Sequence, residues 1–284
     1  MSFKHSRDNL IANIAQQTVG LVLAVAVPFF LSVDEYAQVT VITVLIAFLP
    51  LSDLGLSIIY CRKLPALYDN KNTNEVNRWN ATVIHFKLYT SLIFALLISS
   101  YYFYRYQFVL NAILLFCFVV FTSIFAYVIA NATVQTDFRY IRNLTFLQVL
   151  TKLTVLPSVW VAGINGWFFG QLFSLLALVL NKRFRIPLQH LFAKPDWKLL
   201  KKNLAQGLLF SMVTTLWLQL MSSGRFYASF AYPDSIVAQY GLLGSFYQII
   251  IALSIAAFVP QTIKIYRLFE KDEVAAINYS FKLA

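Results

Sequence analysis

The sequence predicts an all-α polytopic membrane protein, and three observations carry that prediction. Of the 284 residues, 59% are hydrophobic and only 12% are charged, whereas soluble proteins have about 25% charged and 45–50% apolar residues. The apolar residues form long runs and not the one-sided stripe of a soluble helix. Lys and Arg collect on one side of the spans that these runs define.

A helix needs about 20 mostly apolar residues to cross the hydrocarbon core of a bilayer. On this measure we predict eight spans: residues 9–31, 36–60, 81–104, 108–131, 144–161, 164–180, 204–227 and 235–259. The boundary between the fifth and sixth spans is inferred from length. Residues 144–180 as one helix would be about 55 Å long, against a core of about 30 Å. We therefore expect a tight turn at residues 163–166, GING.

The positive charges predict the orientation. With a cytoplasmic N-terminus, 21 of the 23 Lys and Arg lie on the cytoplasmic side or in the cytoplasmic half of a span, and only Arg105 and Arg225 lie beyond. Merging any two spans would place the basic loop 182–202 outside. The net charge of +11 is therefore explained by topology, and nucleic acid is not an expected partner. The loops leave no room for a soluble domain.

The two ends of the chain resemble each other. Residues 34–38, DEYAQ, open the second span, and residues 234–240, DSIVAQY, open the eighth. A chance match of short motifs is the alternative to a repeat. Six spans separate the copies, so both would enter the membrane from the same side, as in transporters built of parallel repeats. We predict a six-helix bundle at 1–181, a basic cytoplasmic linker at 182–203, and an incomplete second bundle at 204–284. On this view the chain is truncated.

Polar residues form matched stripes on the first and seventh spans. They are Asn9, Asn13, Gln16, Gln17 and Gly20 on the first, and Gly207, Ser211, Thr214, Thr215, Ser222 and Arg225 on the seventh. Each set lies within about 100° of the helix circumference. Such stripes serve either as hydrogen-bonding contacts between helices or as the lining of a hydrated cavity. Their presence on repeat-equivalent helices favours the cavity.

Lys152 is the sharpest single candidate, because it lies near mid-membrane in the fifth span with Gln148 on the same face. A central Lys costs about 2.5–3.5 kcal/mol on insertion scales. It therefore needs a structural partner such as Asp137 or Asp53, an escape to the inner interface, or a role as an anion-binding cation in the cavity. Pro157 follows on the same span and is expected to kink it.

Two further charges lie within predicted spans. Arg225 shares the polar stripe near the outer face, where its side chain could also reach outward to the interface. Asp53 lies at the depth of Arg62 and Lys63, so an ion pair or a packing hydrogen bond is favoured over a proton site.

No pattern of catalytic residues appears. Cys61 and Cys117 lie in apolar stretches without metal-binding spacing, and no Ser-His-Asp or phosphate-loop spacing is present. We predict no cofactor, no metal and no catalytic residue.

Residues 51–57, LSDLGLS, followed by Arg62, resemble the second-helix signature of bacterial polysaccharide-export flippases, the Wzx-type O-antigen transporters of the MATE-like MOP superfamily. The polar first helix with Asn13, Gln16 and Pro28 is similar to that family too, and so is the start of the second half of the chain at residues 203–207. The resemblance implies a MATE-like fold of two bundles around a central, often cationic cavity. Family members have more helices than the eight predicted here.

The resemblance also implies a function: flipping an undecaprenyl-pyrophosphate-linked oligosaccharide across the bacterial inner membrane by alternating access. The partners would be this lipid-linked glycan, the bilayer and other polysaccharide assembly proteins. Lys152 and Arg225 would offset the diphosphate or acidic sugars, and Asp53 and Pro157 would have structural or gating roles. The remaining cavity-lining residues would be Asn13, Gln16, Gln17, Gln148, Ser211 and Thr215.

Two alternatives stay open. A MATE-type cation-coupled antiporter of small molecules shares the architecture, but it would be expected to line its cavity with acids. An integral-membrane enzyme of glycan assembly would be expected to show a large far-side loop or clustered catalytic residues.

Overall fold

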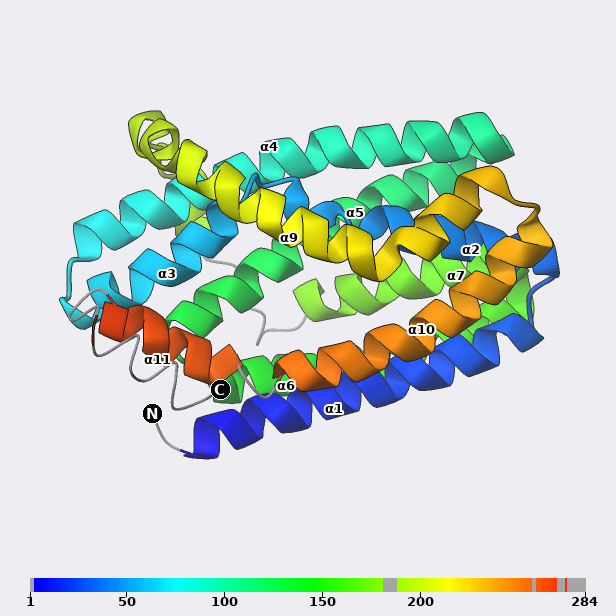
Figure 1. Cartoon of the computed structure of the whole chain (residues 1–284), viewed down its shortest axis with the longest axis horizontal. Helices are drawn as coiled ribbons and strands as arrows, with labels where there is room; N and C mark the ends of the chain where they lie inside the picture. The colour runs from blue at the N-terminus through cyan, green and yellow to red at the C-terminus, as the bar shows by residue number, and fades with distance from the viewer. Residues whose placement is uncertain (1–2, 181–187, 257–258, 270–273, 275–284) are drawn as a thin grey trace.

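The computed structural model describes residues 3–180, 188–256, 259–269 and 274. Within these residues every regular element is a helix and no strand occurs. The long helices run side by side along the longest axis of the molecule (Figure 1). The α-helices are α1 Phe3–Ala26, α2 Val33–Ile46, α3 Leu56–Asp69, α4 Thr73–Tyr106, α5 Val109–Val134, α6 Phe138–Lys152, α7 Val155–Leu180, α8 Leu188–Phe192, α9 Trp197–Ala231, α10 Asp234–Ala256 and α11 Val259–Phe269, with 3₁₀ turns η1 Val27–Phe29 and η2 Leu49–Leu51.

The apolar helices are consistent with an all-α membrane protein. Five helical segments of the described chain are long and apolar enough to cross a bilayer: Leu10–Phe29, Val33–Leu51, Thr73–Tyr106, Val109–Val134 and Val155–Leu178. Large apolar side chains on α4 and α5 point outward, among them Ile93, Leu96, Leu97 and Ile113, each more than half exposed. An apolar surface of this kind is stable against lipid rather than water.

The second predicted span, 36–60, is not one continuous helix, so that expectation was wrong. Pro50 has no N–H to donate, and Leu54 (φ +51°) and Gly55 (φ +75°) adopt left-handed backbone between α2 and α3. The Asp53 carboxylate accepts a hydrogen bond from the Gly55 N–H at 3.1 Å, which holds the turn. The LSDLGLS segment therefore contains the break between the two helices, and its last two residues, Leu56 and Ser57, begin α3.

The fifth predicted span, 144–161, also differs. The Asp137 side chain caps α6, which therefore begins six residues before the predicted start. Pro157 cannot donate to the Leu153 carbonyl, and its ring excludes continuous helix there. The chain accordingly breaks between α6 and α7, which confirms the kink expected from Pro157. Lys152 becomes the last residue of α6.

The turn expected between the fifth and sixth spans is confirmed. The backbone leaves helical geometry at Ala162 and at Gly163 (φ +56°), so α7 is two helical segments. They fold back closely, because a Cβ at Gly166 would collide with the Ser158 carbonyl. The Glu35 carboxylate accepts a hydrogen bond from the Ile164 N–H at 3.2 Å and ties the turn to the start of α2.

Helices α9, α10 and α11 pack against α1, α2 and α3. Helix α10 contacts α1 and α2, α9 contacts α2 and α3, and α11 contacts α3 and α1. If α9, α10 and α11 are taken as the repeats of α1, α2 and α3, each of these contacts has an equivalent: α1 with α10 corresponds to α9 with α2, and α1 with α11 corresponds to α9 with α3. Two structural repeats would give this pattern. Two contacts are especially close: Gly55 with Gly207, and Thr40 with Gly241. The division at 1–181, 182–203 and 204–284 stays a prediction.

Candidate functional site

Six helices enclose a cavity of about 180 Å³ that contains both predicted cations. Lys152 from α6 and Arg225 from α9 are 73 positions apart in sequence, and the fold brings them to the same space. The other lining residues are Gly20, Leu23, Ala24, Val27, Tyr36, Val39, Thr40, Thr43, Trp167, Gln171, Gly241 and Ser245. No carboxylate is among the described residues that line it.

Lys152 has no acidic partner in the described part of the chain. Both partners considered from the sequence are engaged elsewhere, which contradicts that explanation of its charge. Asp137 caps the start of α6, and Asp53 pairs with Lys87. Lys152 ends α6, where the final carbonyls of a helix lack intrahelical donors and the helix dipole is negative. This end-of-helix position offsets part of the cost of the charge, and it was not predicted from the sequence.

Arg225 is buried, with 5% of its surface exposed, and it lies in the cavity rather than at the outer surface. Its side chain rests on Gly244 of α10, where any Cβ would collide with it. Tyr36 lines the same cavity and interacts electrostatically with Arg225. No ion pair joins Arg225 to a described acid. This placement disagrees with the alternative in which the Arg225 side chain reaches outward to the interface.

Neutral polar groups complete the lining. Gln171 on the second segment of α7 and Thr40 and Thr43 on α2 supply an amide and hydroxyls. Gln171 was not predicted from the sequence. Its signal was available, because an amide in the middle of the apolar span 164–180 is costly in lipid unless it faces protein or water.

The other predicted cavity residues are not among those that line this space. Gln148 lies one turn before Lys152 on α6, and its Oε1 is buried without a hydrogen-bond partner among the described residues. Asn13, Gln16 and Gln17 lie on α1 before Gly20, the first α1 residue of the lining; Gln16 is exposed, and Asn13 and Gln17 are half-buried. The Thr215 side chain lies outside the described part.

Ser211 lines a different pocket, of about 290 Å³, together with Asp53, Ser57 and Lys87. Asp53 is only 2% exposed, and Lys87 Nζ on α4 lies 3.1 Å from its Oδ2. The Ser57 hydroxyl donates to the same carboxylate oxygen and accepts from Lys87 Nζ at 3.1 Å. Asp53 is thus in a structural ion pair, as predicted.

Arg62 and Lys63, which the sequence places at the same membrane depth as Asp53, are not its partners. Arg62 lies over the ring of Phe269, 4.5 Å from the ring centre. Lys63 Nζ donates to Asn203 Oδ1 at 2.8 Å. The partner comes from a helix that begins seventeen positions after Leu56, so neighbouring sequence did not reveal it.

No protein family, no curated protein and no solved structure matches this chain. The resemblance to polysaccharide-export flippases therefore rests on the residues quoted for it and stays a prediction.

Proposed function

We propose that this chain is a transporter that flips an undecaprenyl-pyrophosphate-linked oligosaccharide across the bacterial inner membrane. The observation that carries the proposal is the placement of Lys152 and Arg225 in one cavity whose described lining has no carboxylate. Two cations held in apolar surroundings without acidic partners attract a multivalent anion strongly, because the local dielectric is low. A diphosphate supplies that charge.

The two cations suit a diphosphate in different ways. The guanidinium of Arg225 has a planar fork of donors that can bind two phosphate oxygens at once, and Gly244 supports it from behind. Lys152 acts as a compact charge at the end of α6. Gln171 can donate a further hydrogen bond, whereas the Thr40 hydroxyl, which already donates to the Tyr36 carbonyl at 3.0 Å, can only accept one.

The size of the cavity limits what it can hold. About 180 Å³ is less than the roughly 300–1,000 Å³ of sites for drug-sized ligands. It accommodates a phosphate-sized group and not an oligosaccharide, whose lipid would stay in the bilayer. Transport then requires α1 and α2 to separate from α9 and α10, in the manner of alternating access. The break at Pro157 and the turn at Gly163 provide hinges in the wall.

The proposal includes the eight-span topology with a cytoplasmic N-terminus. It is favoured over a cation-coupled antiporter because the acid that an antiporter needs is missing from the described lining, and Asp53 is already paired in another pocket.

The test is complementation of a bacterium that lacks its own O-antigen flippase and carries the cognate glycan pathway. We expect surface polymer to be restored, and to fall about tenfold or more with Lys152→Ala or Arg225→Ala, since a hydrogen bond to a charged group contributes about 1.5–3 kcal/mol. Lys201→Ala, exposed on α9, is the control at matched expression. Full export by both cavity variants would refute the role assigned to the cations. Glycan units trapped inside despite normal expression would refute the substrate.

A further inference from the structure

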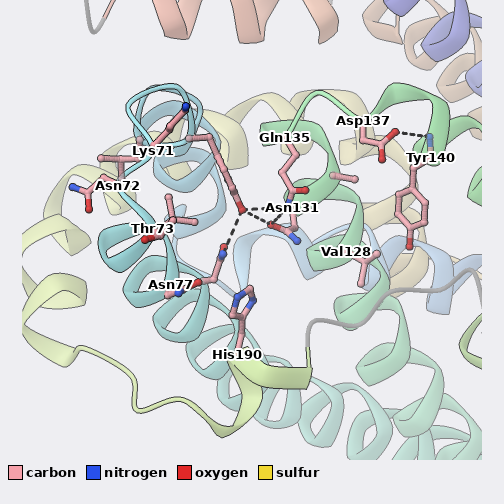
Figure 2. A pocket seen from close by; sticks show the side chains of 15 residues that line it. Lys71, Asn72, Thr73, Asn77, Val128, Asn131, Gln135, Asp137, Tyr140 and His190 are labelled. Atoms are coloured by element: carbon pink, nitrogen blue, oxygen red, sulfur yellow. Dashed lines mark hydrogen bonds between the residues drawn. The ribbon is translucent and has the colours of Figure 1, made fainter.

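A larger pocket, of about 590 Å³, lies away from the cationic cavity (Figure 2). It is formed where α3 and α5 end, where α4 and α6 begin, and beside α8. Its volume is within the range of about 300–1,000 Å³ typical of small-molecule sites. In the proposed topology this end faces the cytoplasm.

The lining of this pocket is polar but nearly uncharged. Five carboxamides line it: Asn72, Asn77, Asn80, Asn131 and Gln135. The charged lining residues are one cation, Lys71, and one carboxylate, Asp137, which is occupied as the cap of α6 and accepts a hydrogen bond from the Tyr140 N–H at 3.0 Å. Carboxamides both donate and accept hydrogen bonds, so they suit a neutral ligand with many hydroxyl groups.

A hydrogen-bond network holds three of these amides, Asn80, Asn131 and Gln135, before any ligand binds. The hydroxyl of Tyr60 lies 2.7 Å from Asn80 Oδ1 and 2.9 Å from Asn131 Oδ1. Gln135 Nε2 donates to Asn131 Oδ1 and to the Tyr68 hydroxyl, each at 3.1 Å. Figure 2 shows dashed hydrogen bonds that reach Asn131. The Asn131 carbonyl is therefore saturated, whereas its NH₂ donates to no described group.

His190 adds a second unsatisfied group. It is 6% exposed, and its Nδ1 is buried without a hydrogen-bond partner in the part of the chain that is described. Figure 2 shows its ring on the wall of the pocket beside Asn77. Burial lowers the pKa of the imidazole, so the ring is neutral at pH 7 and can both donate and accept.

We propose that this pocket is a second binding site, specific for a neutral polyhydroxylated ligand such as a hexose or an N-acetylated hexosamine. The preorganised amides and the neutral imidazole match hydroxyl groups that donate and accept, and Tyr68 and Tyr140 add aromatic side chains to the lining, the residue type that packs on the C–H face of a sugar. The pocket is poorly suited to a diphosphate, because Lys71 is opposed by Asp137. The inference rests on the proposed function only for placing this end in the cytoplasm, where a glycan would first be met.

The experiment measures binding of radiolabelled glucose and N-acetylglucosamine to the purified full chain by equilibrium dialysis, with inorganic phosphate as a competitor. We expect saturable binding of at least one sugar, unaffected by phosphate. Asn77→Ala and His190→Leu should each weaken it about two- to tenfold, the change expected for one hydrogen bond. Asn77 is exposed at the helix surface, so its variant keeps the protein folded even if His190→Leu does not. Asn74→Ala, exposed on the same helix but outside the pocket, is the matched control.

The outcomes separate this inference from the proposed function. Lys152→Met should abolish export and leave sugar binding unchanged, because it alters only the cationic cavity. Sugar binding that depends on Asn77 upholds the inference even if complementation fails. Absence of saturable binding of either sugar, binding displaced by phosphate, or equal binding by the Asn77 and Asn74 variants would overturn it.

Discussion

Removal of the Lys87 charge should destabilise the protein through Asp53. Both side chains are nearly inaccessible, 12% exposed for Lys87 and 3% for Asp53. Breaking a buried pair by removing one partner costs about 3–5 kcal/mol, because the other charge is left without compensation. Ser57 and the Gly55 N–H still donate to the carboxylate. We therefore expect the lower end of that range, about 3 kcal/mol, for Lys87→Met.

The pair is best measured as a double-mutant cycle. Asp53→Asn alone leaves Lys87 unpaired and should also destabilise. The combined variant has no buried charge, and replacing a whole buried pair by neutral groups is often close to neutral. We expect it to lie within about 1 kcal/mol of the native protein, so that the coupling is large and favourable.

The assay is thermal unfolding in detergent, followed by the loss of monodisperse protein on size-exclusion chromatography. A loss of about 3 kcal/mol corresponds to a lower midpoint by about 6–12 °C for a chain of this size. Lys201→Met, an exposed lysine of α9, should change the midpoint little. If Lys87→Met behaves like this control, or if the double variant is as unstable as the two single variants added together, the assignment of Lys87 as the compensating charge is wrong.

Two other perturbations follow from the geometry. Gly55→Ala should destabilise by about 2–5 kcal/mol, from roughly 1–2 for left-handed backbone and 1–3 for the collision with the Gly207 carbonyl. In the control, Gly20→Ala, the new Cβ meets no atom within 4 Å, so this variant should be neutral or stabilising by up to about 1 kcal/mol. Equal melting temperatures for the two variants would contradict this. Burial lowers the pKa of His190, so the unfolded chain takes up a proton first as the pH falls; stability should be full above about pH 6.5 and decrease below it. His190→Asn should flatten that acid-side slope, and an unchanged slope would assign it to another group.

The sequence predicted correctly those features that depend on the cost of burying groups in lipid. Lys152 was identified as a candidate because a Lys within an apolar span is costly to insert into lipid. The turn found at Gly163 was predicted because residues 144–180 are too long for one membrane-spanning helix. Pro157 required the break that ends α6. Each of these follows from local chemistry together with the thickness of the membrane, without knowledge of which helices are neighbours.

Features that depend on which helices meet could not be read in the same way. Hydropathy treats residues 36–60 as one apolar run, because Leu54 and Gly55 are as apolar in the left-handed conformation as in a helix. The partner of Asp53 is on α4, and proximity in sequence favoured Arg62 and Lys63 instead. The amide pocket draws on α3, α4, α5, α6 and α8, so it exists only once the helices are packed.

Lys152 and Arg225, the two cations of the cavity, contrast with the other cations of the same molecule. Lys87, Arg105 and Arg267 are half-buried, and each pairs with a carboxylate. The remaining half-buried cations of the described chain meet an amide, an aromatic ring or another partner: Arg62, Lys63, Arg142 and Lys264.

Lys152 and Arg225 differ from all of these, because neither makes an ion pair, a side-chain hydrogen bond or a cation–π contact with a described residue, and both line the same cavity. The dipole at the end of α6 offsets Lys152 only in part, since a helix terminus contributes about 0.3–1 kcal/mol and up to about 2 in buried geometry, whereas a central Lys costs about 2.5–3.5 kcal/mol. Two uncompensated charges of the same sign also repel each other. A fold that pairs its other buried cations and leaves these two together gains most from an anion that arrives from outside the chain, which is what a transporter of a diphosphate-linked substrate requires.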